Sequence, residues 1–354
     1  MPLRRRRLAA LGAAALCTAA GASQRDRPYA CTGEFQVAGH GSSSLVLSSS
    51  QNISGRNSSV SVENGRTIVA RLGSRAYFAS SCAAGAYDPR LYARPNLLGK
   101  TLRFTVDLRG AGCGCDAMVY LTAMGRGKGA SKCPDHYCDA NVACGEACAE
   151  VDIMEANQRA WHSTLHSSRD KSGASAGFGG GGAGWSGPRD WTAEQYGPRG
   201  TCIDTTRPFG VAASFPVGDG GLLAAMHVAL SQDGQSCPLS ISIAGYKDSR
   251  DIMEALSAGM TPVVSYWAGR HTGWMDGAGS DGQGPCDGHG PQECAESVRI
   301  SNFSVTDFDK ATESRASERP PKHHNFSWLM DSPGLGGNGG WMTSPYSRAR
   351  GSQV

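Results

Sequence analysis

A recurring pattern of short apolar or alternating runs, bounded by glycine, serine and aspartate, most constrains the fold of this chain. Such runs predict β-strands, and no amphipathic segment of a dozen residues indicates a long helix. Many strands with few helices favour an all-β fold, a β-sandwich of two antiparallel sheets with long loops. The predicted strands are Ser43–Leu47, Val60–Val62, Thr67–Leu72, Thr101–Leu108, Ala117–Met124, Glu150–Met154, Phe209–Phe215, Ala225–Leu230, Leu239–Ile243, Pro262–Trp267 and Val298–Val305.

The length of 354 residues, with 48 glycines, suits one large β domain rather than two compact ones. We place this domain at 24–308. Residues 171–187 are too rich in glycine to pack and predict a long surface loop. Residues 309–354 carry basic, proline, serine and glycine residues without periodicity, which predicts a disordered C-terminal tail.

Residues 1–23 have the pattern of a secretory signal peptide. Arginines at Arg4–Arg7 precede the apolar run Leu8–Ala20 and the small residues Gly21–Ser23. No later segment is long and apolar enough to span a bilayer. We therefore expect a secreted protein, located outside the cell or in the cell wall.

The cysteines support export. One of the 13 cysteines lies in the predicted leader, and the remaining twelve can form up to six disulfides, whose pairing the sequence leaves open. A zinc site at Cys133, Cys138, Cys144 and Cys148 is the alternative, but the spacing is irregular and an oxidising compartment disfavours free thiolates. Asn-x-Ser sequons at Asn52, Asn57, Asn302 and Asn325 fit a glycosylating secretory route.

The charge balance excludes some partners. The formal net charge of +3 includes the arginines of the leader, so the mature chain is close to neutral. Nucleic acid and anionic membranes are therefore not expected partners. We expect a monomer without a cofactor.

The segment from Glu150 to Asn157 concentrates three carboxylates within a run of strand-forming residues. Glu150 and Asp152 share one face of a strand, whereas Glu155 is out of phase. One extra residue in a β-bulge near Ile153 and Met154 would return Glu155 to the carboxylate face. Crowded carboxylates suit a glycosidase, because repulsion keeps one of them protonated while another stays ionised. A solvated acidic strand edge or a Ca²⁺ site is the structural alternative.

The motif Glu150-x-Asp152-x-x-Glu155-Ala-Asn, preceded by Cys148-Ala149, resembles the active-site strand of family seven glycoside hydrolases, which are cellulases. The resemblance implies a retaining enzyme that cleaves β-1,4-glucosidic bonds of a β-glucan, with Glu150 as nucleophile, Glu155 as acid/base and Asp152 tuning the pair. A related family in the same clan acts on β-1,3 and mixed-linkage glucans and shares the carboxylate spacing. That specificity stays open.

Further segments resemble the family between about residues 90 and 307: Gly99–Leu108, Cys113–Met124, Tyr137–Asn141, Trp185–Arg189 and Gly259–Trp267. On this basis His166 is expected near the acid/base residue and Arg189 on the leaving-group side. Trp267 and Trp274 are expected to stack under sugar rings. The expected substrate-binding residues are Asp116, Tyr120, Asp139, Asn141, His166, Arg189, Trp267 and Trp274. Without the resemblance, Tyr120 would be an ordinary strand aromatic, Asp139 a turn residue and His166 a structural histidine. The two tryptophans would be buried core residues.

The chain also departs from the family pattern. Asp116 stands where the family usually has asparagine, and Met154 where it usually has tryptophan. No tryptophan precedes Trp161, and the segment from Cys138 to Cys148 is shortened. These losses predict an open cleft that suits internal cuts. A catalytically inactive carbohydrate-binding protein on the same sandwich is the alternative from another class, and retention of all three carboxylates argues against it.

Overall fold

The computed structural model describes residues 31–49, 59–82, 85, 87–125, 131–170, 178–179, 190–269, 272–277, 286 and 294–309. The predicted signal peptide lies outside these residues, as do nearly all of the predicted 309–354 tail and most of the predicted 171–187 loop. Within the described part of the chain, no helix combines the length and the apolar character needed to cross a membrane.

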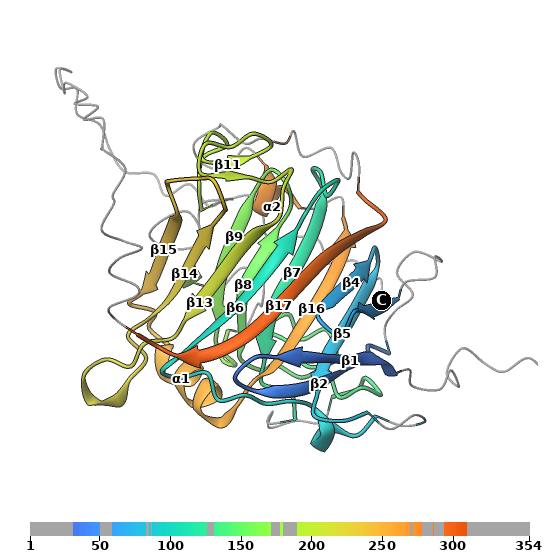
Figure 1. Ribbon diagram of the computed structural model, residues 1–354. Coiled ribbons are helices and arrows are strands. Elements are labelled where there is room, and N and C mark those ends of the chain that lie inside the picture. The colour runs from blue at the N-terminus through green and yellow to red at the C-terminus, as the bar shows by residue number, and fades with distance from the viewer. Residues whose placement is uncertain are drawn as a thin grey trace, which may run out of the picture. The chain divides into compact units, whose positions relative to one another are not determined.

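Two large antiparallel sheets form the body of the protein (Figure 1). The eight-stranded sheet has the order β1 (Cys31–Val37), β2 (Gly41–Leu47), β5 (Ser74–Ala79), β16 (Thr261–Ala268), β7 (Cys115–Thr122), β8 (Glu150–Ala156), β9 (Trp161–His166) and β10 (Phe178–Gly179). The seven-stranded sheet has the order β15 (Leu239–Ala244), β14 (Ala225–Ser231), β13 (Phe209–Ser214), β6 (Lys100–Asp107), β17 (Ser297–Asp307), β4 (Thr67–Arg71) and β3 (Val60–Glu63). The predicted all-β sandwich is confirmed.

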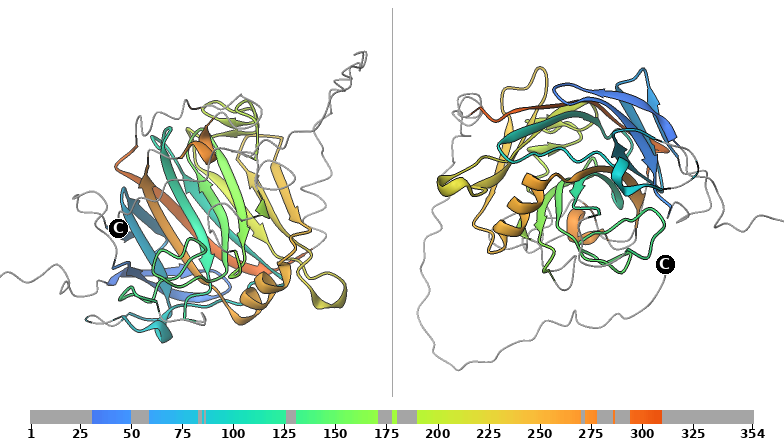
Figure 2. Two further views of the ribbon diagram at one scale, coloured as in Figure 1. Left: turned by 180° about the vertical axis from the view of Figure 1, so that it is seen from behind. Right: turned by 90° about the horizontal axis from the view of Figure 1, so that it is seen from below.

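The core lies between these sheets, which Figure 2 shows from below as two layers. Alternate side chains of each strand point into it. Phe35 and Phe78 of the eight-stranded sheet meet Phe303 of the other sheet at ring-centroid distances of 6.0 and 5.1 Å. Phe104, also on the seven-stranded sheet, stacks on Phe303 at 5.4 Å. These aromatic contacts join the two layers.

All eleven predicted strands are present, with ends that differ by a few residues. The strands β1, β5 and β9 were missed, as were the two-residue strands β10, β11 (Tyr196–Gly197) and β12 (Ile203–Asp204). The sequence of β9 hides its core face because Ser163 stands there between Trp161 and Leu165. The structure satisfies this buried hydroxyl, which accepts a hydrogen bond from Trp161 Nε1 (2.9 Å) and donates one to the carbonyl of Ile153 (2.8 Å). A polar residue with partners can therefore occupy a core position.

The sequence pattern did not predict helix α1 (Ser249–Ala258), because its ten residues are fewer than the dozen expected of a recognisable amphipathic segment. It buries Ile252, Ala255 and Leu256, which are spaced as one helix face. Gly259 ends the helix with φ 92°, and a Cβ there would lie 2.3 Å from the carbonyl oxygen of Arg94. The remaining elements are short: α2 (Gly273–Asp276), the 3-10 turns Pro89–Leu91 and Asp219–Gly221, and the parallel pair β11 (Tyr196–Gly197) and β12 (Ile203–Asp204).

The twelve cysteines after residue 23 form six disulfides, as expected for export. The pairs are Cys31–Cys82, Cys113–Cys286, Cys115–Cys294, Cys133–Cys144, Cys138–Cys148 and Cys202–Cys237. The four cysteines of the alternative zinc site thus form two disulfides, and their sulfur atoms are not available to a metal. Of the four sequons, Asn302 is described, and it is exposed on β17.

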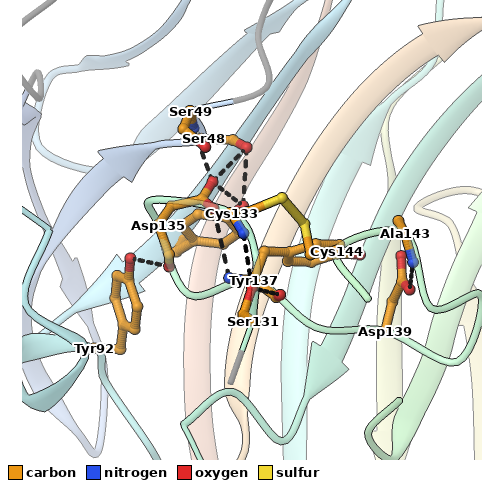
Figure 3. The surroundings of a disulfide bond; sticks show 11 residues. Ser48, Ser49, Tyr92, Ser131, Cys133, Asp135, Tyr137, Asp139, Ala143 and Cys144 are labelled. Atoms are coloured by element: carbon orange, nitrogen blue, oxygen red, sulfur yellow. Dashed lines mark hydrogen bonds between the residues drawn. A yellow bond between two sulfur atoms is a disulfide. The ribbon is translucent and has the colours of Figure 1, made fainter. Parts of the chain in front are cut away.

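Asp135 anchors the segment 131–148, which is braced by the Cys133–Cys144 disulfide (Figure 3) and by the Cys138–Cys148 disulfide. Its carboxylate accepts hydrogen bonds from the hydroxyl groups of Ser48 (2.8 Å) and Tyr77 (2.9 Å) and from the backbone N–H of Ser49 (2.8 Å). The hydroxyl group of Tyr92 donates to the Asp135 carbonyl at 2.7 Å. The segment is therefore fixed to the part of the sheet that contains β5.

We expect Asp135→Ala to lower the free energy of unfolding by about 2–4 kcal/mol, because it removes the acceptor of three hydrogen bonds, from the Ser48 and Tyr77 hydroxyl groups and the Ser49 N–H. Denaturant titration under non-reducing conditions measures this change. Asp233→Ala, at an exposed turn position, is the control and should change stability by less than about 0.5 kcal/mol. Equal midpoints for the two variants would contradict the anchoring role.

Candidate active site

A β-bulge in β8 brings the three carboxylates to one face of the eight-stranded sheet. Opposite β7, Asp152 pairs with Tyr120 and Met154 with Val119, so Ile153 is the extra residue. Opposite β9, Asp152 pairs with Thr164 and Glu155 with His162, which again gives β8 one extra residue. The bulge predicted near Ile153 and Met154 is confirmed, and Glu155 rejoins the face of Glu150 and Asp152.

This face points away from the seven-stranded sheet, because the alternate residues of the same strands fill the core. The register arranges its side chains in rows across the strands. The row through Glu150 contains Thr261, Thr122 and His166, and the row through Asp152 contains Tyr77, Val263, Tyr120 and Thr164. The row through Glu155 contains Arg75, Ser265, Met118 and His162. Strands distant in sequence thus build one polar surface.

The three carboxylates are buried: Glu150 is 5% exposed, Asp152 3% and Glu155 8%. The alternative interpretation as a solvated acidic edge is therefore wrong. A buried cluster of like charges is unfavourable unless some members are protonated or compensated. The groups around each carboxylate decide which state it adopts.

Glu150 has partners that favour its ionised form. Its Oε2 accepts a hydrogen bond from the backbone N–H of Ala140 at 2.9 Å. Burial, followed by the charges of Asp152 and Asp139, raises the pKa of Glu150 well above its usual value, and the Ala140 N–H and the guanidinium of Arg75 act in the opposite direction. A hydrogen-bond donor and a nearby cation are what a carboxylate nucleophile requires in order to stay ionised.

Glu155 has a different environment. Burial raises its pKa, and the charges of Asp152 and Asp116 raise it further. These influences all favour the protonated carboxyl group, which is the state of a general acid. The two glutamates thus lie on the same strand but differ in their partners, since the pKa of Glu150 is lowered by a hydrogen-bond donor and a cation that act against its burial.

Asp152 stands between the glutamates and contacts His166. The His166 Nε2 atom lies 3.3 Å from Asp152 Oδ2, and the Nδ1 atom of the same ring lies 3.9 Å from Asp170 Oδ2. Asp170 also accepts a hydrogen bond from the hydroxyl group of Tyr246 at 2.8 Å. This chain of contacts orients the Asp152 carboxylate. His166 was expected near Glu155, but the register places His166 opposite Glu150 and gives the place opposite Glu155 to His162.

Asp116 and Tyr120 lie on β7, on the same face as the carboxylates. Asp116 is fully buried, and burial raises its pKa, as do the charges of Asp152 and Asp276. The Tyr120 hydroxyl group is 3.1 Å from that of Tyr137, and burial raises the pKa of Tyr120. The structure therefore brings both predicted residues to the candidate site.

The segment 137–141 contributes unequally. Asp139 is buried, and its Oδ1 accepts a hydrogen bond from the backbone N–H of Ala143 at 2.9 Å, so it also acts as a turn residue. Its charge still reaches Glu150, because it raises the pKa of that residue. Asn141 is exposed.

Both predicted tryptophan platforms are half-buried. Trp267 ends β16 opposite Asp116, and its Nε1 atom donates a hydrogen bond to the sulfur of Met118 at 3.2 Å. Trp274 lies in α2, and its ring meets the ring of His162 edge to face at 5.6 Å. The alternative interpretation, that both tryptophans are buried in the core, is therefore wrong. Arg189 lies outside the described residues.

Three features of the site were missed from sequence: Arg75, the backbone N–H of Ala140, and His162. Arg75 lies above the ring of Tyr137 at 4.3 Å and was hidden in the unrecognised strand β5. A lone arginine between strand-forming residues was its only signal. Nothing in the sequence could mark the Ala140 N–H, since every residue except proline has one.

The described residues do not offer a convincing metal site. Two groups have ligand atoms within 4.8 Å of one another, Cys113 with Asp276 and Cys286, and Cys133 with Asp135 and Cys144. In each group the two cysteines form a disulfide with each other. Neither group can therefore supply thiolate ligands.

No family model matches the chain. Among curated relatives, Endoglucanase EG-1 of Hypocrea jecorina is 30% identical over 253 residues, which covers 58% of this chain and 52% of the relative. Endo-beta-1,4-glucanase celB of Emericella nidulans is 28% identical over 264 residues, which covers 56% of this chain and 61% of the relative. The chain thus spans about half to three fifths of the length of these relatives.

Solved structures share the fold. A GH7 family cellobiohydrolase from Daphnia pulex matches with a TM-score of 0.55 at 15% identity, over 82% of this chain and 98% of that one. The Humicola insolens Cel7B glycosynthase mutants match with a TM-score of 0.53 at 18% identity, over 80% of this chain and 98% of theirs. The chain shares the fold of glycoside hydrolase family seven and is similar in sequence to curated endoglucanases. The motif that resembles this family lies on β8, where the bulge places the carboxylates together.

Proposed function

We propose that the protein is a secreted, retaining glycoside hydrolase that cleaves β-1,4-glucosidic bonds, with Glu150 as nucleophile and Glu155 as acid/base. The main support is the bulge in β8, which puts both glutamates on one buried face, where Glu150 accepts a hydrogen bond from the Ala140 N–H and lies near the guanidinium of Arg75. The similarity to curated endo-beta-1,4-glucanases supports the linkage. The six disulfides support export.

The proposed reaction has two steps. The ionised Glu150 attacks the anomeric carbon while Glu155 gives its proton to the departing oxygen, which yields a glycosyl-enzyme ester. Glu155, now ionised, takes a proton from water, and the water releases the sugar from Glu150. We infer that the two side chains converge over Asp152 to the separation of about 5–5.5 Å that this course requires. Asp152, oriented by His166, holds a negative charge between them.

The remaining predicted residues would bind the sugars. Trp267 and Trp274 are half-buried, so each leaves part of its ring for the C–H face of a glucose unit. Asp116, Tyr120, Asp139, Asn141 and Arg189 complete the proposed substrate-binding set. A β-glucan is the proposed substrate, and the protein acts as a monomer.

We propose that the substrate lies in an open groove and is cut internally. The support is the absence of tryptophan before Trp161 and the short segment closed by the Cys138–Cys148 disulfide. Fewer aromatic platforms hold fewer sugars, so residence on a chain should be brief.

The expected result on a soluble β-1,4-glucan is an early fall in viscosity while few reducing ends are released. Viscometry and reducing-end assays on the same samples measure both. Laminarin and mixed-linkage glucan, tested in parallel, separate the β-1,4 specificity from the β-1,3 alternative. Dominant cellobiose with little loss of viscosity would contradict internal cutting, and no hydrolysis of any glucan would contradict the enzymatic proposal.

A further inference from the structure

His162 is a histidine of this face that the proposed mechanism does not use. It stands directly opposite Glu155 in the β8–β9 ladder. Directly opposed residues of an antiparallel pair have Cβ atoms about 4.5–5.5 Å apart, so the imidazole can reach the Glu155 carboxyl group. The side chain is 1% exposed, and the ring of Trp274 packs against it at 5.6 Å. The imidazole is therefore confined beside the proposed acid/base residue.

The groups around His162 are mostly acidic. The backbone N–H of Asp190 donates a hydrogen bond to the carbonyl of Trp161 on β9. The charge of Asp190 raises the pKa of Glu155. Helix α2 packs on β9 and contributes Asp276 as well as Trp274. The described charged and titratable groups that face this region are Glu150, Asp152 and Glu155 of β8, Asp116 of β7, His166 of β9, Asp190, Asp276 of α2, and the cation Arg75 of β5 in the same row.

We propose that His162 is a positioning residue for the reaction, whose charge, placed opposite Glu155, sets the pH at which the Glu155 carboxyl group gives up its proton. This inference rests on the proposed function. Several carboxylates around one imidazole favour its protonated form. The imidazolium then stabilises the ionised Glu155, which is the form that must take a proton from water in the second step. His162 gives up no proton in either step of the reaction, so its role is electrostatic.

The first test is the pH dependence of kcat/KM for His162→Gln on a soluble glucan. Loss of the cation should shift the basic limb upward by about one pH unit, because an ionised Glu155 would lose its neighbouring positive charge. His227→Gln, on β14 of the other sheet, is the matched control and should leave the profile unchanged. A basic limb that is unchanged in His162→Gln, or shifted equally in the control, would overturn the proposal.

The second test does not depend on activity or on the stability of a His162 variant. Coupling between two titrating groups is reciprocal, so Glu155→Gln should lower the pKa of the His162 imidazole by a similar amount. NMR titration of isotope-labelled histidine in the wild-type and Glu155→Gln proteins measures this shift. An unchanged His162 titration would overturn the coupling even in an active enzyme. A lowered one would support it even if no glucan were hydrolysed, which would count against the proposed function alone.

Discussion

Replacing Glu150 with glutamine is expected to lower the rate of glucan hydrolysis by at least about 10⁴-fold. Glutamine keeps the size of the side chain and can still accept the hydrogen bond from the Ala140 N–H. It cannot, however, form the glycosyl ester that divides the reaction into two steps. Substrates with good leaving groups should suffer equally, because both substrate types need the nucleophile.

The measurement is kcat/KM of the purified variant on a soluble glucan and on an activated aryl cellobioside. Glu194→Gln, at an exposed position, is the matched control and should retain full activity. Thermal unfolding of each variant separates loss of chemistry from loss of fold. If folded Glu150→Gln kept even a tenth of the activity on either substrate, Glu150 would not be the nucleophile.

Replacing Glu155 with glutamine should lower kcat/KM on glucans by about 10²–10⁴-fold, the usual contribution of a general acid. An aryl cellobioside with a dinitrophenolate leaving group needs no proton for the first step, so its kcat/KM should fall much less. The second step still lacks its base, and the glycosyl-enzyme should therefore accumulate. A burst of dinitrophenolate followed by slow turnover is the expected signature.

Rapid mixing and mass spectrometry of the trapped intermediate measure this burst. The ratio of the losses on glucan and on the activated substrate is the decisive quantity, since a structural defect would lower both equally. Equal losses with no burst would assign the acid/base role to another group. Asp116 would then be the next residue to test, because burial and the charge of Asp152 also raise its pKa.

Much of this protein can be predicted from local patterns in its sequence. The period of two in the predicted strands indicated a β-sandwich, and the spacing of Glu150, Asp152 and Glu155 predicted the bulge in β8. Both predictions depend on neighbouring residues of one strand, where backbone geometry decides which face a side chain occupies. The even number of cysteines likewise indicated disulfides, because this inference depends only on composition and on the compartment in which the protein folds.

The pairing of the strands was decided by the tertiary structure. The order β5, β16, β7, β8 and β9 brings Arg75 and His162 into the row of Glu155. Arg75 is far from the other two residues in sequence. Strand order and register depend on packing between sheets and on loop closure, which a single strand does not encode. The same holds for the six disulfide pairs. It also holds for the Ala140 N–H, which reaches Glu150 because Asp135 and two disulfides hold its segment against the sheet. The three carboxylates could thus be predicted from the sequence, whereas the different partners of Glu150 and Glu155 arise only when distant segments meet.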